Sequence, residues 1–560
     1  MVNQRRNQEI SNLSFFVMVV IVVNILSSFL FTRFDFTKEK RFTLSDITKT
    51  LLGNLKEDVQ ITIYLEGEFP PGFKRLQTST KDLLSEYKAY SNGNLRFDFV
   101  NPLAGDTDRQ KATYEELLGK GIEPTNLSVK TDEGMSQKMI YPAALISYNG
   151  RQFPVKLLQN KTGSNPEEVL NNSIQILEYA FTSAIKKVSQ DGKPRIGFTE
   201  GHGELTDLQL NGAMQGLADG YEVGRIDLKS IKFAGLDKLN LLIIPKPNIA
   251  FTEAEKYKID YYVMRGGRVL WAVDNVNAEL DSLRKGQQLA FAKKLNLDDI
   301  LFKYGVRINY NLIADMNCSQ IPINVGNVGG ESQIQLLPWL FYPLFVPKVS
   351  HPIVKNLDAL RGEFASTIDI IEDKEVKHQV ILTSSPFSRA VEIPTLLSLQ
   401  MVEQEPDPKT FKSTPKPVGV LIEGNFSSDF KNRPVPEEIT EQVSIPEKSK
   451  PNKMIVLSDG DLLKNQVSTT DGSPFPLGYD RYTEQQYGNL NFLLNIADYL
   501  TDDSGIIELR NKEIKIRLLD KSRIREEKTK WQVINIVLPL LLLLIGGLIQ
   551  QYYRKQKYSK

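Results

Sequence analysis

Two apolar segments, one near each end of the sequence, constrain what this chain can fold into. The first covers residues 13–31 and carries no charged side chain, and the second covers residues 533–549. At a rise of about 1.5 Å per residue, a helix of this length can cross a hydrocarbon layer about 30 Å thick. Trp531, Tyr552 and Tyr553 flank the second segment, where amphipathic rings favour the headgroup layer. We therefore predict one transmembrane helix at each end and a folded body between them.

The orientation of these two spans follows from the sequence around them. A cleaved signal peptide is the alternative for the first segment, but the residues after it, FTRF at 31–34, lack a small-residue cleavage pattern. Two spans place both termini on one side of the membrane. Arg554, Lys555 and Lys557 follow the second span with no acid among them. Basic residues on the other flank, such as Arg33 and Arg41, reduce this contrast. A long domain is translocated largely regardless of its own charge, so we predict cytoplasmic termini and a body outside the cytoplasm.

The overall charge excludes one class of function. The 69 basic and 68 acidic side chains give a formal net charge of +1, and no basic block forms a footprint for phosphate. We therefore expect no nucleic-acid partner. The single cysteine, Cys318, excludes an internal disulfide framework and a metal cluster built on cysteines.

The first part of the body, residues 35–160, has the pattern of a small α/β domain. Residues 59–65 and 95–100 alternate like strands, and residues 73–90 between them have helical apolar spacing. This order predicts a βαβ unit. Asn149-Gly150, the preferred pair of a type I′ turn, predicts a hairpin that closes the domain.

A helix then links the two parts of the body, across residues 165–190. Asn165 is its expected N-cap and Pro166 its first residue. The second domain, residues 191–520, contains a loop at residues 402–453 that is rich in Pro, Lys and Glu and is expected to be exposed.

The second domain alternates strands with helices, which predicts a doubly wound, flavodoxin-like parallel sheet. Residues 239–245 form a nearly continuous apolar run, typical of a strand buried on both faces. The other predicted strands cover residues 195–199, 221–228, 268–273, 418–422 and 454–457, and the predicted helices cover residues 207–218, 252–264 and 490–500. Residues 508–519 fit either a strand or the start of the last helix.

The first candidate site is the turn EGHGE at residues 200–204, directly after the first strand of the predicted sheet. Ligands bind open α/β sheets at the carboxyl ends of the strands. His202 between Glu200 and Glu204 could act as a base or bind a metal ion, but further ligands with recognisable spacing are lacking. The alternative, which we favour, is a hydrogen-bonded turn that caps the next helix.

Two further segments are candidates for interactions. Asp459 and Asp461 follow the predicted strand 454–457 and could coordinate a cation, although termination of the strand explains them more simply. Residues 334–347 are hydrophobic and interrupted by prolines, which predicts a buried loop or an exposed surface for a partner.

The motifs that the sequence lacks narrow the function further. No G-x-x-x-x-G-K-[ST] pattern is present, so the chain is not an ATPase of the P-loop type. It also lacks a G-x-S-x-G elbow and a cysteine after a predicted parallel strand. The simplest interpretation is an inactive, glutamine-amidotransferase-like version of the fold, without a cofactor or a metal ion.

The order of the short motifs resembles the family of gliding-motility-associated ABC transporter auxiliary proteins (GldG). The resemblance covers nearly the whole chain, from one anchor to the other. It rests on RFTLS at 41–45, LSEY at 84–87, FDFVNP at 97–102, GFTEGHGE at 197–204, RGGRVL at 265–270 and VLSDGD at 456–461.

This resemblance implies a non-enzymatic accessory subunit in the inner membrane, with a periplasmic domain. It implies a partner permease, a separate ATPase and contact with membrane lipid, and a homo-oligomer within the complex is a further possibility. It implies no catalytic residues. The alternatives are a membrane-anchored hydrolase and a ligand-binding subunit, each built around the turn that contains Glu200, His202 and Glu204.

Overall fold

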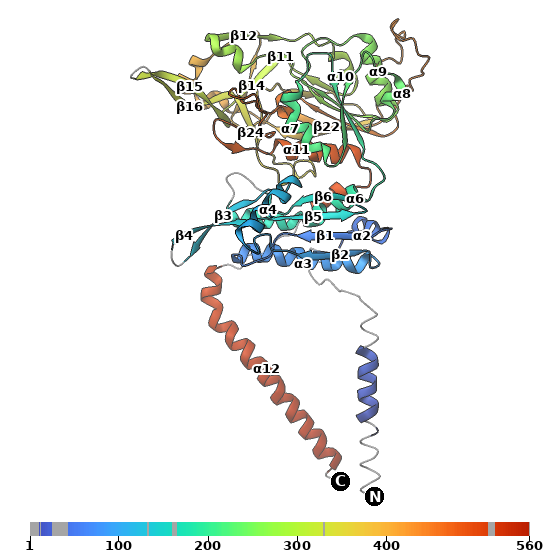
Figure 1. Cartoon of the computed structure of the whole chain (residues 1–560), viewed down its shortest axis with the longest axis vertical. Coiled ribbons are helices and arrows are strands. Elements are labelled where there is room, and N and C mark those ends of the chain that lie inside the picture. The colour runs from blue at the N-terminus through green and yellow to red at the C-terminus, as the bar shows by residue number, and fades with distance from the viewer. Residues whose placement is uncertain are drawn as a thin grey trace. The chain divides into compact units, whose positions relative to one another are not determined.

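The computed structural model describes residues 11, 13–24, 43–131, 134–159, 165–328, 331–512 and 521–558. These residues fall into two compact units. One unit contains the folded body up to Lys512, and the other contains helix α12 (Lys521–Tyr558), drawn in red in Figure 1. Each unit is described separately.

Helix α12 is the membrane-span candidate among the described residues. Its segment Arg523–Gln556 is long enough to cross a bilayer, contains an 18-residue window with a mean hydropathy of 2.4, and includes the predicted span 533–549. The helix is continuous through Pro539. Of the predicted first span, 13–31, the structure describes the shorter apolar helix Leu13–Asn24, and the remainder lies outside the described residues.

The N-terminal part of the body is built on a four-stranded sheet with the order β2-β1-β5-β6. Strands β1 (Val59–Ile63) and β2 (Leu95–Phe99) are parallel and are joined by helix α3 (Pro71–Tyr90), which confirms the predicted βαβ unit. Strands β5 (Ala143–Tyr148) and β6 (Arg151–Lys156) form the predicted hairpin. Asn149 and Gly150 have φ angles of 46° and 76°, as a type I′ turn requires.

The predicted linker helix at residues 166–190 is two helices, α5 (Pro166–Gln175) and α6 (Leu177–Ser189), with a break at Ile176. Asn165 caps α5 as predicted, because its side chain accepts a hydrogen bond from the Glu168 amide. The apolar side chains of α6, including Phe181 and Ile185, are fully buried in the core of the N-terminal sheet. The remaining elements of this part are α2 (Asp46–Gly53), α4 (Thr107–Gly119), β3 (Thr125–Thr131) and β4 (Gly134–Ile140).

The second part of the body contains a seven-stranded sheet. Its first five strands, β8-β7-β9-β10-β23, are mutually parallel, and β22 and β19 extend the sheet in antiparallel fashion. Numbered along the chain, the parallel strands have the order 2-1-3-4-5, which is the flavodoxin-like order. The strands are β7 (Arg195–Glu200), β8 (Glu222–Asp227), β9 (Leu241–Pro245), β10 (Arg268–Ala272), β19 (Val376–Thr383), β22 (Pro417–Gly424) and β23 (Asn452–Leu457).

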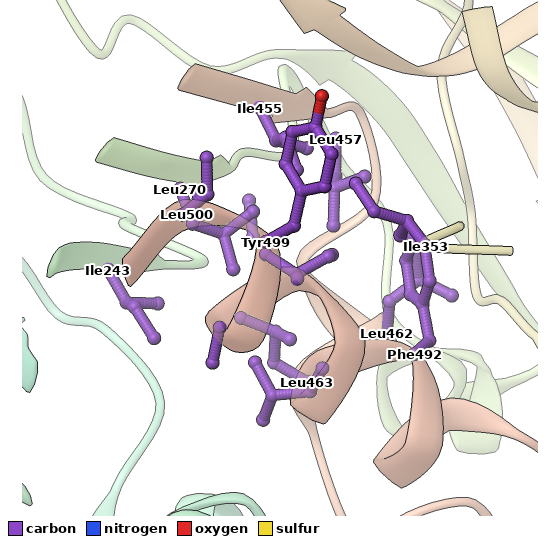
Figure 2. Close-up of a cluster of buried hydrophobic side chains, with 14 of the residues drawn as sticks. Ile243, Leu270, Ile353, Ile455, Leu457, Leu462, Leu463, Phe492, Tyr499 and Leu500 are labelled. Atoms are coloured by element: carbon purple, nitrogen blue, oxygen red, sulfur yellow. The ribbon is translucent and has the colours of Figure 1, made fainter. Parts of the chain in front are cut away.

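Helices cover both faces of this sheet, and its central strands β9 and β10 are buried at nearly every position. Ile243 and Leu270 point to the core under α7 (Asp207–Ala218) and α11 (Asn489–Thr501), where Figure 2 shows them with Phe492 and Leu500. The alternate residues, such as Trp271, point to the core under α8 (Phe233–Leu236), α9 (Glu253–Met264) and α10 (Asp298–Lys303). The predicted helices 207–218, 252–264 and 490–500 are thus confirmed as α7, α9 and α11.

The structure differs from the inserted loop predicted at residues 402–453, because strand β22 lies inside this range. In the large sheet, β22 pairs with β23 on one side and with the edge strand β19 on the other. Phe426 and Phe430, which follow β22, are buried in the core under α9. The exposed parts of the segment lie mainly in residues 403–416, before β22, and in residues 431–447, after it.

Apart from helix α10 and strand β19, which belong to the large sheet and its cover, residues 276–412 form a β-rich region inserted after β10, with a core around Trp339 and Phe341. The segment 334–347, predicted as a loop, belongs instead to strand β16 (Glu331–Phe345), which pairs with β15 (Cys318–Val328) across Pro338 and Pro343. The other strands here are β11 (Val276–Asn277), β12 (Gln287–Ala292), β13 (Val306–Ile308), β14 (Asn311–Asp315), β17 (Leu360–Arg361), β18 (Ile368–Ile370), β20 (Ser388–Glu392) and β21 (Thr395–Ser398).

The chain returns from α11 through a short 3-10 helix, η5 (Ile506–Asn511), which packs against α6. The other short 3-10 segments of the described residues are η1 (Leu280–Lys285), η2 (Leu399–Glu403), η3 (Pro408–Phe411) and η4 (Gly460–Leu463). A small two-stranded sheet pairs β24 (Tyr479–Asp480) with β25 (Gln485–Gln486). Of the predicted segment 508–519, residues 513–520 lie outside the described residues.

Candidate functional site

The turn after β7 lies at the carboxyl edge of the parallel sheet, as the sequence predicts. It holds His202 in the interior, with the side chain only 4% exposed and the ring stacked on Phe251 at a centroid distance of 3.8 Å. The His202 Nδ1 atom lies 3.2 Å from Glu204 Oε1, and Nε2 lies 3.1 Å from Glu255 Oε2. Both ring nitrogens therefore face carboxylates.

The two carboxylates that face His202 have further partners of their own. The backbone amide of His202 donates to Glu204 Oε2 at 2.6 Å. Glu255 is the third residue of α9 and completes a capping box with Thr252, whose amide and hydroxyl each donate to Glu255 Oε2 at 2.8 Å. His202 thus ties the β7–α7 turn to the beginning of α9.

This arrangement favours the charged imidazolium. Burial alone would lower the pKa of His202, but the hydrogen bonds to Glu204 and Glu255 outweigh burial and raise it. Burial would raise the pKa of Glu204 and of Glu255, but the hydrogen bond to His202 lowers that of Glu204, and the hydrogen bonds from Thr252 and His202 lower that of Glu255. An imidazolium with both N–H groups donated to carboxylates has no lone pair with which to accept a proton or to bind a metal ion.

Glu200, the third residue of the predicted turn site, is not brought to His202 by any contact among the described residues. Its carboxylate lies 3.3 Å from Arg225 Nε, on the neighbouring strand β8, and is half exposed. The structure therefore separates Glu200 from the pair formed by His202 and Glu204.

The topological switch point of the sheet, where ligands bind in folds of this type, lies between β7 and β9, because the strand order reverses there. Here the two loops that follow these strands bond to each other. The amides of Asn248 and Ile249 both donate to the His202 carbonyl at 2.8 Å, and the Asn248 side-chain amide donates to the Gly203 carbonyl at 2.7 Å. The backbone groups that could bind a ligand at this position thus form hydrogen bonds between the two loops instead.

The second predicted turn, with Asp459 and Asp461, lies at the end of β23 and is fully buried. The cation beside it is the ammonium of Lys246, which follows β9 and is 2% exposed. Lys246 Nζ lies 2.5 Å from Asp461 Oδ2, 2.7 Å from Glu279 Oε1 and 3.3 Å from Asp274 Oδ2. The ends of β9, β10 and β23 are thus joined by one buried charge cluster.

The cluster extends to the β-rich region through a second lysine. Lys464 Nζ donates to Asp461 Oδ1 at 2.8 Å and lies 3.4 Å from Glu363 Oε2. Glu363 also accepts from Arg361 Nη1 at 2.6 Å. The positive groups Lys246, Lys464 and Arg361 thus each contact at least one carboxylate of the cluster.

The ionisation of the cluster follows from these contacts. Burial would lower the pKa of Lys246, but Asp461, Asp274 and Glu279 raise it well above its usual value. Burial would raise the pKa of Asp461, but Lys246 and Lys464 lower it. Asp459 behaves differently: burial, together with the charges of Asp461 and Asp274, raises its pKa well above the usual range.

The carboxylates of Asp274, Asp459 and Asp461 lie within 4.8 Å of one another, close enough to share a metal ion. The Lys246 ammonium already contacts two of them, and its positive charge opposes a second cation at the same oxygens. The Asp459 carboxylate is also engaged, because Oδ2 accepts from the Glu363 amide and Oδ1 from the Asp461 amide, both at 2.9 Å. This donor set fits a lysine better than a metal ion.

Sequence reasoning found the two acidic turns but missed their buried partners. Glu255 carried a usable signal, because Thr252-x-x-Glu255 has the spacing of a capping box. Lys246 carried a weaker signal, a single charged residue immediately after a strand that is buried throughout. Its φ of 54° marks it as an unusual position, but only the structure shows this.

The sheet order and the helices on both of its faces make the second part of the body a doubly wound, flavodoxin-like α/β domain. Comparison with known families identifies it further. The model of the family described as an ABC-type uncharacterized transport system matches residues 193–496, just over half of the chain. The chain belongs to this family, and it is an auxiliary component of an ABC-type transport system. A second model, a domain of unknown function (DUF7088), matches residues 38–147.

Individual proteins resemble the chain more distantly. An uncharacterized protein of Borreliella burgdorferi is 23% identical over 562 aligned residues, which cover 99% of each chain. Among solved structures, the mmIFT52 N-terminal domain is 14% identical, with a TM-score of 0.32 over 55% of this chain and 98% of its own. A putative ThuA-like protein from Bacteroides uniformis is also 14% identical, with a TM-score of 0.26 over 56% of this chain and 94% of its own.

Proposed function

We propose that this protein is a non-catalytic, membrane-anchored accessory subunit that pairs with a separate permease and a separate ATPase. The observation that supports a non-catalytic role is the pairing of the candidate groups with each other. Both nitrogens of His202 face carboxylates, and the Lys246 ammonium is shared among Asp461, Glu279 and Asp274. A general base or a nucleophile needs a free lone pair near the substrate, and these groups offer none.

The proposal also assigns a place in the cell. We place α12 in the inner membrane, both termini in the cytoplasm and the folded body in the periplasm. The length and hydropathy of α12 support membrane attachment, and the basic residues after the span support a cytoplasmic C-terminus. The assignment to gliding motility rests on the motif order that resembles the gliding-motility auxiliary proteins. Contact with membrane lipid and a homo-oligomer within the complex belong to the same proposal.

Co-purification from the native host tests the proposed partners. The full-length chain carries an affinity tag, is extracted in mild detergent, and its companions are identified by mass spectrometry. We expect a polytopic permease and an ATPase subunit, both missing from a parallel purification of an unrelated tagged single-span protein. A chain that is reproducibly recovered alone and intact would contradict the accessory role.

A cysteine-accessibility experiment tests the proposed topology. Burial raises the pKa of Cys318 to about 12, so the native thiol reacts slowly and is replaced by alanine for the experiment. New cysteines are placed at exposed positions, Asp471→Cys in the body and Gln556→Cys after the span. A maleimide that cannot cross the inner membrane should label Asp471→Cys alone in intact inner-membrane spheroplasts. Labelling of Gln556→Cys alone would contradict this topology, because it would place the C-terminus outside the cytoplasm and the body inside it.

A hydrolase that uses Glu200, His202 and Glu204 is the competing function. Purified full-length protein is assayed with casein and with nitrophenyl glycosides, beside the His202→Gln variant. We expect equal, background-level rates for both proteins. Hydrolysis by the native protein that is lost in a folded His202→Gln variant would contradict the non-catalytic proposal.

A further inference from the structure

The two ends of the folded body meet at one buried carboxylate, that of Glu178 on α6. The body begins at residue 43, and its last described residue is Lys512, before the chain continues to α12. Lys512 Nζ donates to Glu178 Oε2 and to the Thr43 carbonyl, both at 2.7 Å. The other carboxylate oxygen, Oε1, accepts from the Ser45 amide at 2.7 Å and from the Thr48 hydroxyl at 3.0 Å. One side chain therefore holds residues that are more than 460 positions apart.

The contact between Glu178 and Lys512 is enclosed by buried, hydrogen-bonded side chains. The Glu178 side chain is 7% exposed, and that of Lys512 is 22% exposed. Thr48 and Thr182 are fully buried and lie 3.0 Å apart through their hydroxyls, and the Tyr87 hydroxyl bonds to Thr182 and to the Glu178 carbonyl. A charged pair that is this well enclosed is costly to separate, because either charge would remain buried without its partner.

The same helix also holds the parallel-sheet domain. Tyr179, the next residue on α6, donates to Asp498 Oδ2 at 2.6 Å, and Lys187 Nζ lies 2.8 Å from Asp498 Oδ1. Asp498 lies on α11, which covers one face of the parallel sheet. Lys186 forms an additional short ion pair with Asp502. Helix α6 is thus in contact with the beginning of the body, its end, and the helix layer of its large domain.

We propose that α6 joins the two ends of the folded body into one conformational unit, with Glu178 as the latch between residues 43–48 and residues 506–512. A displacement or opening of one end then also displaces or opens the other end and α6, instead of remaining confined to the first segment. The inference concerns contacts within this chain and does not depend on the permease, on the ATPase or on the direction of the body relative to the membrane.

Hydrogen exchange of the full-length protein in detergent tests the latch, because it reports the opening of each segment separately. The decisive variant is Lys512→Met, which removes the ammonium from one end and leaves Glu178 and residues 43–48 unchanged. Loss of a hydrogen bond to a charged group corresponds to an increase of about tenfold in the opening equilibrium. Helix α2 follows the N-terminal end of the body, whereas Lys512 is at its C-terminal end. We therefore expect hydrogen exchange in α2 to increase about tenfold.

Three further variants make the result specific. Lys512→Arg keeps the positive charge and should restore most of the protection of α2. Glu178→Gln keeps an oxygen for Ser45 and Thr48 but presents an amide to Lys512, so exchange should rise more in residues 505–512 than in α2. Lys431→Met removes a surface ion pair with Glu447, whose partners are 40% and 70% exposed, and should leave both segments unchanged.

Two outcomes would overturn the proposal. If Lys512→Met increases exchange in residues 505–512 alone, Lys512 fastens only its own segment, and the two ends are independent. If exchange increases equally in β9 and β10, the variant destabilises the whole body, and Glu178 has no specific role between the ends. Failure of the chain to co-purify with transporter subunits would leave this result unaffected.

Discussion

Replacement of Lys246 by methionine should destabilise the body strongly. Methionine has a similar length but no charge, so Lys246→Met removes the cation from the centre of Asp461, Glu279 and Asp274. The lysine side chain is 2% exposed and that of Asp461 is 1% exposed. Removal of one partner from a buried ion pair costs about 3–5 kcal/mol, because the remaining charges stay buried without compensation. This loss is a large fraction of the total stability of about 5–15 kcal/mol that is typical of a folded protein.

The assay uses the chain's own tryptophans. Trp271, on β10, and Trp339, on β16, are both fully buried, so urea unfolding of the detergent-solubilised protein should shift their fluorescence. We expect the Lys246→Met transition at a clearly lower urea concentration, with an unfolding free energy reduced by about 3–5 kcal/mol. The matched control is Lys431→Met, which breaks an exposed pair with Glu447 and should cost less than about 1 kcal/mol.

A second variant separates the ion pair from the packing of the side chain. In the double variant Lys246→Met with Asp461→Asn, one of the unpaired charges is also removed, so the double variant should be more stable than Lys246→Met alone. The reasoning would be refuted by a loss below about 1 kcal/mol in Lys246→Met, or by additive losses in the double variant, because either result means that the charges are not coupled.

Three other predictions concern the turns of the chain. The folded state raises the pKa of His202, so the protonated ring contributes its full stabilisation below the unfolded-state pKa near 6.5 and loses it as the pH rises through the folded-state pKa. In urea titrations, the difference in unfolding free energy between the native protein and His202→Gln should therefore shrink from pH 6 to pH 9. Gly460→Ala would place its Cβ 2.5 Å from Lys246 Cβ, so we expect a loss of about 1–3 kcal/mol by the same titration. Gly150→Ala meets no neighbouring atom but has a φ of 76°, so a thermal scan should show a loss of only about 1 kcal/mol.

Local patterns predicted the regular parts of the fold, because local interactions determine them. The βαβ unit, the type I′ turn at Asn149 and the cap of α9 at Thr252 all follow from side-chain spacing within a few residues. Strand β16 was missed because Pro338 and Pro343 argue against a strand, yet both lie in register with β15. The break at Ile176 was missed because no glycine or proline marks it.

The candidate sites were predicted only in part, because long-range contacts determine their chemistry. The position of Glu200, His202, Glu204, Asp459 and Asp461 after parallel strands could be inferred, since the strand pattern is local. Their charge partners come from other segments. The separation of 215 residues between Lys246 and Asp461 cannot be read from spacing. A lone carboxylate in the sequence therefore indicates a possible ligand, whereas its buried partner decides its role.

The order of the strands in the large sheet has a consequence for the synthesis of the protein. Strand β10 pairs on one side with β9, which directly precedes it, and on the other side with β23, through pairs such as Val269 with Met454. More than 180 residues must therefore leave the ribosome after β10 before its second edge is covered. During that interval the edge is open to pairing with other chains, which favours aggregation. A chaperone that shields the nascent chain would act in the interval between these two strands.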